Sequence, residues 1–246
     1  MRYGIELELD KPELPLDYHR SFISFLKFAF EKYEKGRFFE EYYGVGKQKA
    51  ITFGVLFNKP YFGSQTIKLQ NPQVKMILSS HDPKTAFVYF NALLEVKGEK
   101  HNIHRGNALT LKGIRMEKET NIHQNAVLFK MTSALCLRQH EYKGNKDRYV
   151  SVDSKDFYDV LRKSILEQCQ DYDDRLKPFV PELKIDAHRL RKTVVAFYGQ
   201  KIEVSIGEIG FIGNPRLLDA IAKMNLGSRR GAGFGLLTYI DQWEVN

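Results

Sequence analysis

The chain repeats one order of structural signals, and this repeat limits its possible folds more than any other feature. In each half, a strand-like stretch is followed by an amphipathic helix, further strand-like runs, a second helix and a last strand-like run. Both second helices start at an Asx-Pro dipeptide, Asp82-Pro83 in the first half and Asn214-Pro215 in the second. Asp or Asn at the N-cap with proline at the first helical position is a strong helix start. The repeat predicts two similar units that each mix strands and helices.

The first half begins with the clearest strand. Four apolar residues alternate there with charged or small ones, as in a half-buried strand: Tyr3, Ile5, Leu7 and Leu9. The next segment has apolar residues at helical spacing, which predicts a buried helix face: Phe22, Phe25, Leu26, Ala29, Phe30 and Tyr33. Strand-like runs cover residues 51–57, 65–69, 74–79 and 108–116. The Asp82-Pro83 helix is expected to bury four residues: Ala86, Phe90, Leu93 and Leu94.

The second half follows the same order, with strands predicted over residues 125–138, 193–198, 201–207 and 235–240. Its first helix is expected to be capped by Asp153 or Ser154 and to bury Phe157, Val160, Leu161 and Ile165. The order β-α-β-β-α-β is that of ferredoxin-like, or RRM-like, units. At about 150 residues per domain, 246 residues allow two such units. We therefore predict an α+β chain of two tandem units, residues 1–120 and 121–246, with a glycine-rich loop near the C-terminus.

The composition excludes several classes of protein. The two cysteines form no CxxC motif, which argues against a disulfide scaffold and a thiolate zinc site. No apolar run approaches the ~18 residues of a membrane helix, and the charged N-terminal stretch predicts no signal peptide. We expect a cytoplasmic protein. Lys and Arg exceed Asp and Glu by 38 to 30, and the resulting net charge of +8 permits a polyanionic partner.

The most informative segment for function is the glycine-rich loop over residues 225–235. It contains four glycines and the adjacent Arg229 and Arg230, and it lies between a predicted helix and the last strand. Glycines allow close backbone approach to a ligand, and the arginines supply positive charge, as in a phosphate cradle. The loop matches neither a Walker motif nor GxGxxG after a strand. A flexible hairpin with solvated arginines is an equally weighted alternative.

With this loop, the sequence resembles the RAMP superfamily and, within it, the Cas6 family of CRISPR-associated endoribonucleases. The similar segments are residues 14–26, 49–54, 126–138 and 209–215, followed by Gly233-Phe234-Gly235. The resemblance covers essentially the whole chain. It implies cleavage of CRISPR repeat RNA without metal or cofactor, by attack of a ribose 2′-OH that leaves a 2′,3′-cyclic phosphate.

The resemblance also suggests catalytic positions, where this chain departs from the family pattern. An ungapped comparison places Phe28, Tyr43 and Lys49 where the family has Tyr, His and Lys, so only the lysine is matched. His19 is the one histidine of this region. In one interpretation His19 is the general acid or base, Tyr43 orients and Lys49 stabilises charge. In the other, His19 is structural and the chain cuts slowly or only binds RNA.

The predicted RNA-binding residues combine the basic segment before one strand with the glycine-rich loop. They are Lys47, Arg189, Arg191, Lys192, Gly227, Ser228, Arg229, Arg230, Gly231, Gly233, Phe234 and Gly235. Tyr18, Tyr42 and Tyr61 are further candidates for base stacking. His101 and His104 lack acidic or thiol companions, so we assign them to a solvated loop and predict no metal site. Expected partners are repeat RNA or crRNA and subunits of a CRISPR effector complex, with the chain a monomer or homodimer.

Overall fold

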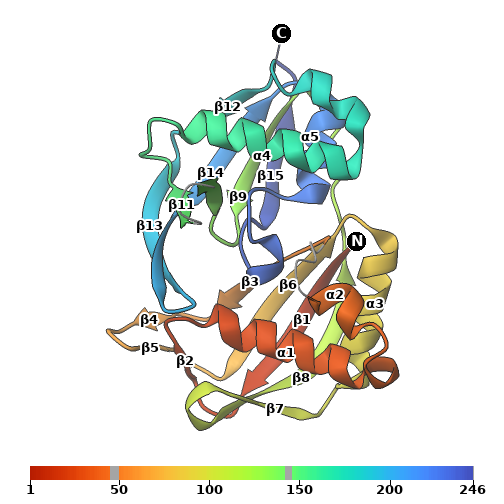
Figure 1. Cartoon of the computed structure of the whole chain (residues 1–246), viewed down its shortest axis with the longest axis vertical. Coiled ribbons are helices and arrows are strands. Elements are labelled where there is room, and N and C mark those ends of the chain that lie inside the picture. Colours follow the sequence, from red (N-terminus) through yellow and green to blue (C-terminus); the bar gives the residue numbers. More distant parts are fainter. Residues whose placement is uncertain (45–49, 142–145, 246) are drawn as a thin grey trace. The chain divides into compact units, whose positions relative to one another are not determined.

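The computed structural model of the chain describes residues 1–44, 50–141 and 146–245 (Figure 1). The chain divides into two compact units. Unit 1 consists of Met1–Lys118 together with Ala196–Gln200, and unit 2 of Glu119–Val195 together with Lys201–Asn246. Both units combine antiparallel sheets with helices, so the chain is α+β. Among the described residues, no helix is long and apolar enough to cross a membrane.

Unit 1 is built on an antiparallel sheet with the strand order β3-β6-β1-β8-β7, beside a small sheet β2-β5-β4. Its elements are β1 (Arg2–Leu9), β2 (Glu13–Pro15), α1 (His19–Lys32), the 3-10 helix η1 (Tyr33–Gly36), α2 (Phe39–Tyr43), β3 (Ile51–Phe57), β4 (Tyr61–Phe62), β5 (Thr66–Lys68), β6 (Gln73–Ser80), α3 (Pro83–Glu95), β7 (Lys100–Ile103), η2 (His104–Gly106) and β8 (Asn107–Glu117).

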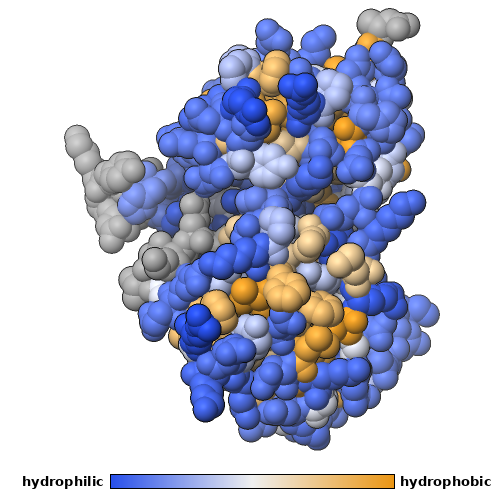
Figure 2. All heavy atoms as spheres, turned by 90° about the vertical axis from the view of Figure 1, so that its right-hand side faces the viewer, coloured by the Kyte–Doolittle hydropathy of each residue, from blue (hydrophilic) through white to orange (hydrophobic). Residues whose placement is uncertain are grey.

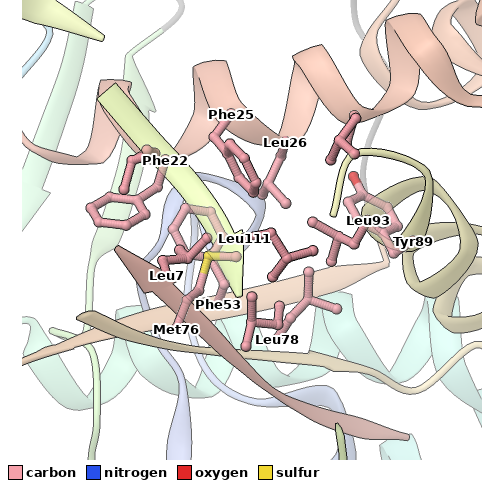
Figure 3. Packing of buried hydrophobic residues seen from close by; sticks show 14 of the residues in the cluster. Leu7, Phe22, Phe25, Leu26, Phe53, Met76, Leu78, Tyr89, Leu93 and Leu111 are labelled. Carbon is pink, nitrogen blue, oxygen red and sulfur yellow. The ribbon is translucent and has the colours of Figure 1, made fainter. Parts of the chain in front are cut away.

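The core of unit 1 lies where the apolar face of α1 and α3 meets the sheet (Figure 3). Phe22 and Phe25 of α1 are fully buried and lie over Leu7 of β1 and Leu111 of β8. Tyr89 of α3 closes the same core from the second helix. Replacing a buried aromatic residue of this kind with alanine costs about 3–5 kcal/mol, so the stripe of α1 is a main source of stability.

Unit 2 has a sheet with the order β12-β14-β9-β15, and β13 also pairs with β14. A separate hairpin, β10-β11, follows β9. The elements are β9 (Ala126–Met131), β10 (Leu137–Glu141), β11 (Lys146–Val150), α4 (Phe157–Tyr172), η3 (Asp174–Phe179), β12 (Lys184–Asp186), β13 (Leu190–Phe197), β14 (Gln200–Ile212), α5 (Pro215–Met224), η4 (Arg230–Ala232) and β15 (Leu237–Trp243).

Both Asx-Pro helix starts are confirmed. The Asp82 carboxylate accepts a hydrogen bond from the Thr85 N–H at 2.9 Å, and the Asn214 side chain accepts one from the Arg216 N–H at 2.9 Å. Each cap satisfies a backbone donor that the first helical turn leaves unpaired, which is worth about 1 kcal/mol.

Three local predictions are wrong. The strand expected over residues 125–138 is two strands, β9 and β10, because Leu135 leaves the ladder of β9 and exchanges backbone hydrogen bonds with Ser205. Helix α4 has Asp156 at its N-cap rather than Asp153 or Ser154. In α3, Leu94 is 41% exposed, because the buried face is turned toward Tyr89.

The outward side of α3 contributes to an apolar area on unit 1. Phe87 and Leu94 of α3 and Met116 of β8 are exposed. Figure 2 shows apolar residues gathered on the side of unit 1 where α3 lies, whereas most of the remaining visible surface is hydrophilic. Elsewhere on unit 1, Tyr61 and Phe62 of β4 are also exposed.

Candidate functional site

The glycine-rich loop is tied to unit 2 by backbone hydrogen bonds. The Gly227 N–H donates to the side-chain oxygen of Gln168 at 3.2 Å, and the Ser228 N–H donates to the Cys136 carbonyl at 2.8 Å. At the other end, the Gly235 N–H donates to the Ala134 carbonyl at 2.8 Å. The loop is therefore a packed segment of the fold rather than a flexible hairpin.

Two glycines of the loop are required by these close contacts. Gly227 has φ +77°, and a Cβ added there would lie 2.6 Å from the Cys136 carbonyl oxygen. Gly235 has the same φ, and a Cβ there would overlap the Leu226 carbonyl oxygen. Both residues hold a left-handed backbone conformation that L side chains rarely adopt. Their first role is to let the loop lie against its own unit.

The side chain of Phe234 is fully buried, so it packs in the protein and presents no face on which a base could stack. Gly233 has φ +93° and is buried as well. The part of the loop that reaches the surface is the segment 228–232, which includes Ser228, Gly231 and both arginines. Contact between the loop and a ligand would be made by this segment.

The two loop arginines have different environments. Arg229 donates from Nε to the Tyr149 hydroxyl at 3.2 Å and from Nη2 to the Asp147 carboxylate at 3.0 Å, and its side chain stays 32% exposed. Arg230 donates from Nη1 to the Met224 carbonyl at 2.7 Å, which satisfies an acceptor in the last turn of α5. Burial lowers the pKa of the Arg230 guanidinium, and the negative charge of nearby Asp171 partly offsets this decrease. Arg229 is the arginine that a ligand can reach more directly.

The basic segment before and within β13 is exposed but partly neutralised. Arg189 pairs with Glu208 at 3.1 Å and Lys192 with Glu203 at 3.1 Å, while Arg191 is exposed. Pairs at this level of exposure are weak in water. The segment can therefore exchange its carboxylate partners for the phosphates of a polyanion.

His19 is the first residue of α1 and is only 2% exposed. Its ring stacks on Tyr18 with centroids 4.1 Å apart and meets the edge of Phe197, also in unit 1, at 5.9 Å. In this arrangement the imidazole is covered by aromatic rings.

Tyr43 lies at the other end of α1. Its ring packs on Phe30 with centroids 5.2 Å apart, and its hydroxyl accepts a hydrogen bond from Tyr89 at 3.1 Å. Burial raises the pKa of Tyr43, although the hydrogen bond with Tyr89 opposes this. Phe30 follows His19 by about 16 Å along the helix axis. The structure thus does not bring His19 and Tyr43 together, and Lys47 and Lys49 lie outside the described residues.

The other aromatic and histidine predictions have mixed outcomes. Tyr42 is 6% exposed, so its proposed stacking role is wrong, whereas Tyr61 is 70% exposed. His101 is not in a solvated loop: its ring stacks on Phe28 at 4.7 Å, and its Nε2 is 2.9 Å from the Ser24 hydroxyl. Within the described ranges, no group of three or more His, Cys, Asp or Glu residues could hold a metal ion.

Sequence reasoning missed one polar cluster, which lies beside the exposed part of the loop. Asp147 of β11 accepts hydrogen bonds from Arg138 and His140 of β10 as well as from Arg229. The available signal was the alternation of Arg138 and His140 before a short polar stretch of sequence and of Asp147 and Tyr149 after it.

Comparison with known proteins gives one family match. A family model described as the C-terminal part of CRISPR associated protein Cas6 matches residues 116–239, half of the chain. The matched range begins in β8 and ends in β15, and it includes the glycine-rich loop. No well-characterised protein is matched when sequences alone are compared.

Solved structures resemble the chain over its whole length. A Cas6-related protein from Pyrococcus furiosus has a TM-score of 0.82 at 18% identity, and the similarity covers 99% of each chain. A RAMP protein described as binding different RNA substrates also has a TM-score of 0.82 at 18% identity, over 98% of this chain and 100% of the other. A Cas6 product complex has a TM-score of 0.70 at 14% identity, over 98% and 100%. At these identities the likeness establishes a shared fold.

Proposed function

The chain belongs to the Cas6 family, of the RAMP type, and from this premise we propose that it binds CRISPR repeat RNA and processes precursor crRNA into guides. The observation that carries the proposal is the family match over residues 116–239, which contain the loop segment with the partly exposed Arg229 and the basic stretch around Arg191. Positive charge on a surface segment beside glycines suits a phosphate backbone. The net charge of the whole chain, +8, is also positive and would attract a polyanion such as RNA.

The proposed reaction is a metal-independent transesterification. The ribose 2′-oxygen forms a bond to the adjacent phosphorus as the bond from phosphorus to the next 5′-oxygen breaks. A base takes the 2′-hydroxyl proton and an acid protonates the departing 5′-oxygen, which leaves a 2′,3′-cyclic phosphate and a 5′-OH. Cationic donors stabilise the charge that develops on the phosphoryl oxygens. The family resemblance proposes His19, Tyr43 and Lys49 for these roles, with no cofactor. Because His19 and Tyr43 lie at opposite ends of α1, we assign the proton transfer to His19 and the charge stabilisation to Lys49, and Tyr43 would join them only after a rearrangement.

A second candidate function is binding of repeat RNA without cleavage, as a subunit of a CRISPR effector complex. The burial of His19 favours it, because a general acid or base must come within hydrogen-bond distance of the reacting oxygen. For His19 to act, the rings of Tyr18 and Phe197 would have to move aside.

One experiment separates the two candidates. Repeat RNA is incubated with excess protein in EDTA, together with a control RNA that carries a 2′-deoxyribose at the scissile nucleotide. A single cut with a cyclic phosphate end, absent from the control RNA, supports the nuclease. Tight binding of repeat RNA that stays intact supports the second function, and failure to bind repeat RNA contradicts both.

The finer organisation is part of the same proposal. We propose that each unit is ferredoxin-like, with boundaries near residues 1–120 and 121–246, and that the protein is cytoplasmic and acts as a monomer or homodimer. The antiparallel orders β3-β6-β1-β8 and β13-β14-β9-β15, each with two intervening helices, support the ferredoxin-like assignment.

A further inference from the structure

The hairpin β10-β11 places four polar side chains on one face. Arg138 lies opposite Tyr149, and His140 opposite Asp147, in the antiparallel register. Directly opposed residues share a face, and so do residues two apart on one strand. The next pair, Leu137 and Val150, belongs to the alternate face and is fully buried in the core of unit 2. The core contact therefore fixes which face the four polar residues occupy.

Asp147 is the centre of this face. Its carboxylate accepts from Nη1 of Arg138 at 3.2 Å, faces Nδ1 of His140 at 2.9 Å and accepts from Nη2 of Arg229 at 3.0 Å. Burial raises the pKa of Asp147, but the hydrogen bonds from His140 and Arg138 and the charge of Arg229 outweigh it and hold the pKa below its ordinary value. Asp147 is thus a carboxylate at neutral pH, shared by donors from two segments.

Arg229 is brought to the hairpin by the glycine-rich loop. The Ser228 N–H is bound to the carbonyl of Cys136, the residue just before β10. Arg229 itself has φ +57°, a left-handed conformation that costs a non-glycine residue free energy. Its guanidinium lies 6.0 Å from the ring centre of Tyr149 and donates to the Tyr149 hydroxyl. A residue held in an unfavourable backbone conformation and at two side-chain contacts is a preorganised group.

Two guanidiniums contact the one carboxylate of Asp147. Their side chains stay 40% exposed for Arg138 and 32% for Arg229, so a ligand can reach both. A guanidinium has a planar fork of donors that matches the paired oxygens of a phosphate. Two such groups fixed around one carboxylate therefore form a site for an anion with several oxygens.

We propose that Arg138 and Arg229, oriented by Asp147, together bind one backbone phosphate of the RNA. The proposal rests on the RNA-binding function proposed above and adds to it a residue outside the loop, Arg138, and a positioning role for Asp147. Phosphate contacts of this kind fix the position of an RNA strand and carry no sequence information. The site is therefore equally available to repeat RNA and to scrambled RNA of the same length.

The test compares Arg138→Gln and Arg229→Gln with Arg175→Gln, a control of identical charge change on η3, where the side chain is 90% exposed and pairs with Asp173. Affinity for a single-stranded RNA is measured at several salt concentrations. We expect each test variant to bind roughly tenfold more weakly at 0.1 M salt and to lower the log–log salt slope by about 0.7, the value for one phosphate. The control should stay within twofold of the wild type.

The double variant Arg138→Gln/Arg229→Gln tests whether the two arginines contact the same phosphate. Because both arginines contact the same phosphate, its slope should be lower than that of the wild type by about 0.7 and not by about 1.4. A loss near 1.4 would replace the shared phosphate with two independent ones. Scrambled RNA should show the same losses as repeat RNA.

Other results overturn the proposal while leaving the proposed function intact. Wild-type protein that binds repeat RNA, with both variants binding as tightly and with the same slope, would show that the arginines only hold the hairpin. If Arg229→Gln does not fold, Arg138→Gln decides alone, since Arg138 lies in β10 and outside the loop. A wild type that binds no RNA contradicts the proposed function itself.

Discussion

Nη1 of Arg230 donates to the carbonyl oxygen of Met224 at 2.7 Å, so one of two adjacent arginines closes the end of helix α5 while its neighbour Arg229 turns toward β11. The two adjacent arginines thus have different roles: Arg230 caps a helix, and Arg229 binds Asp147 of the hairpin.

We expect Arg230→Ala to destabilise the fold by about 1.5–3 kcal/mol, because it removes a charged donor from a partly buried carbonyl. The free energy of unfolding, from denaturant titration, measures the loss. Arg216→Ala, on the exposed start of the same helix, is the control and should change it by less than about 0.5 kcal/mol. Equal stability of the two variants would contradict the capping role of Arg230.

Gly235 of the loop and Gly199, which precedes β14, allow a matched comparison of backbone strain and steric overlap. Gly235 has φ +77° with a carbonyl oxygen where a Cβ would lie, whereas Gly199 has φ +76° and nothing within 4 Å of that point. Gly199→Ala should cost only the conformational penalty of about 1–2 kcal/mol. We expect Gly235→Ala to cost clearly more, measured by thermal and denaturant unfolding. Similar losses at both positions would mean that the loop can shift to admit a methyl group.

The packing and the chemistry of His19 can be tested separately with His19→Phe. A phenyl ring retains the aromatic contacts with Tyr18 and Phe197, so the melting temperature should stay near that of the wild type. If His19 transfers the proton as proposed, the cleavage rate constant falls by about 100-fold or more while RNA affinity is unchanged. Unchanged cleavage by a folded variant would remove His19 from the reaction.

Both cysteines should be unreactive in the folded chain. Burial raises the pKa of Cys136 to about 12 and that of Cys169 to about 11. Because the thiolate is the nucleophile, neither should react with a disulfide reagent at pH 8 until the protein unfolds. Thiol titration should detect no reactive group in native protein and both cysteines in denaturant. Rapid labelling of native protein would contradict the burial.

Asp147 should make the free energy of unfolding depend on pH in the acidic range. Its folded-state pKa lies below the ordinary value of 3.8, so the unfolded chain binds the proton first as the pH falls. The stabilisation is therefore full at neutral pH and is lost below about pH 4, as the pH approaches the folded-state pKa. We expect Asp147→Asn to lower the free energy of unfolding at pH 7 and the difference to shrink at pH 3. The control is Asp153→Asn at an exposed carboxylate, and a constant difference across this range would exclude the ion-pair explanation.

Strands, helices and caps that are determined by residues close together in the sequence were predictable. The residues that alternate from Tyr3 to Leu9 and the stripe from Phe22 to Phe30 each form one face against one core, and they are buried as expected. Tyr33, predicted in the same stripe, lies in η1 and is only partly buried. The Asp82 and Asn214 caps depend on residues only two or three positions away. For these elements the period and the capping chemistry are sufficient.

The remainder depends on partners that are distant along the chain. The stretch 125–138 has strand-forming residues throughout, yet Leu135 pairs with Ser205 instead of continuing the ladder. Phe234 stands between two glycines, a context that suggests exposure, but its burial is decided by tertiary packing. Arg229 and Arg230 are equivalent in the sequence and differ only through Asp147 and Met224.

The backbone contacts of Gly227 and Gly235 have a consequence for genome interpretation. Folding alone is enough to keep glycines at both positions, whether a chain cuts RNA or only holds it. The sequence motif Gly233-Phe234-Gly235 therefore indicates the fold of the loop and does not indicate whether the protein cleaves RNA. Whether this chain cuts RNA has to be decided from residues outside the loop, and His19, enclosed by the rings of Tyr18 and Phe197, is the one that we propose to test first.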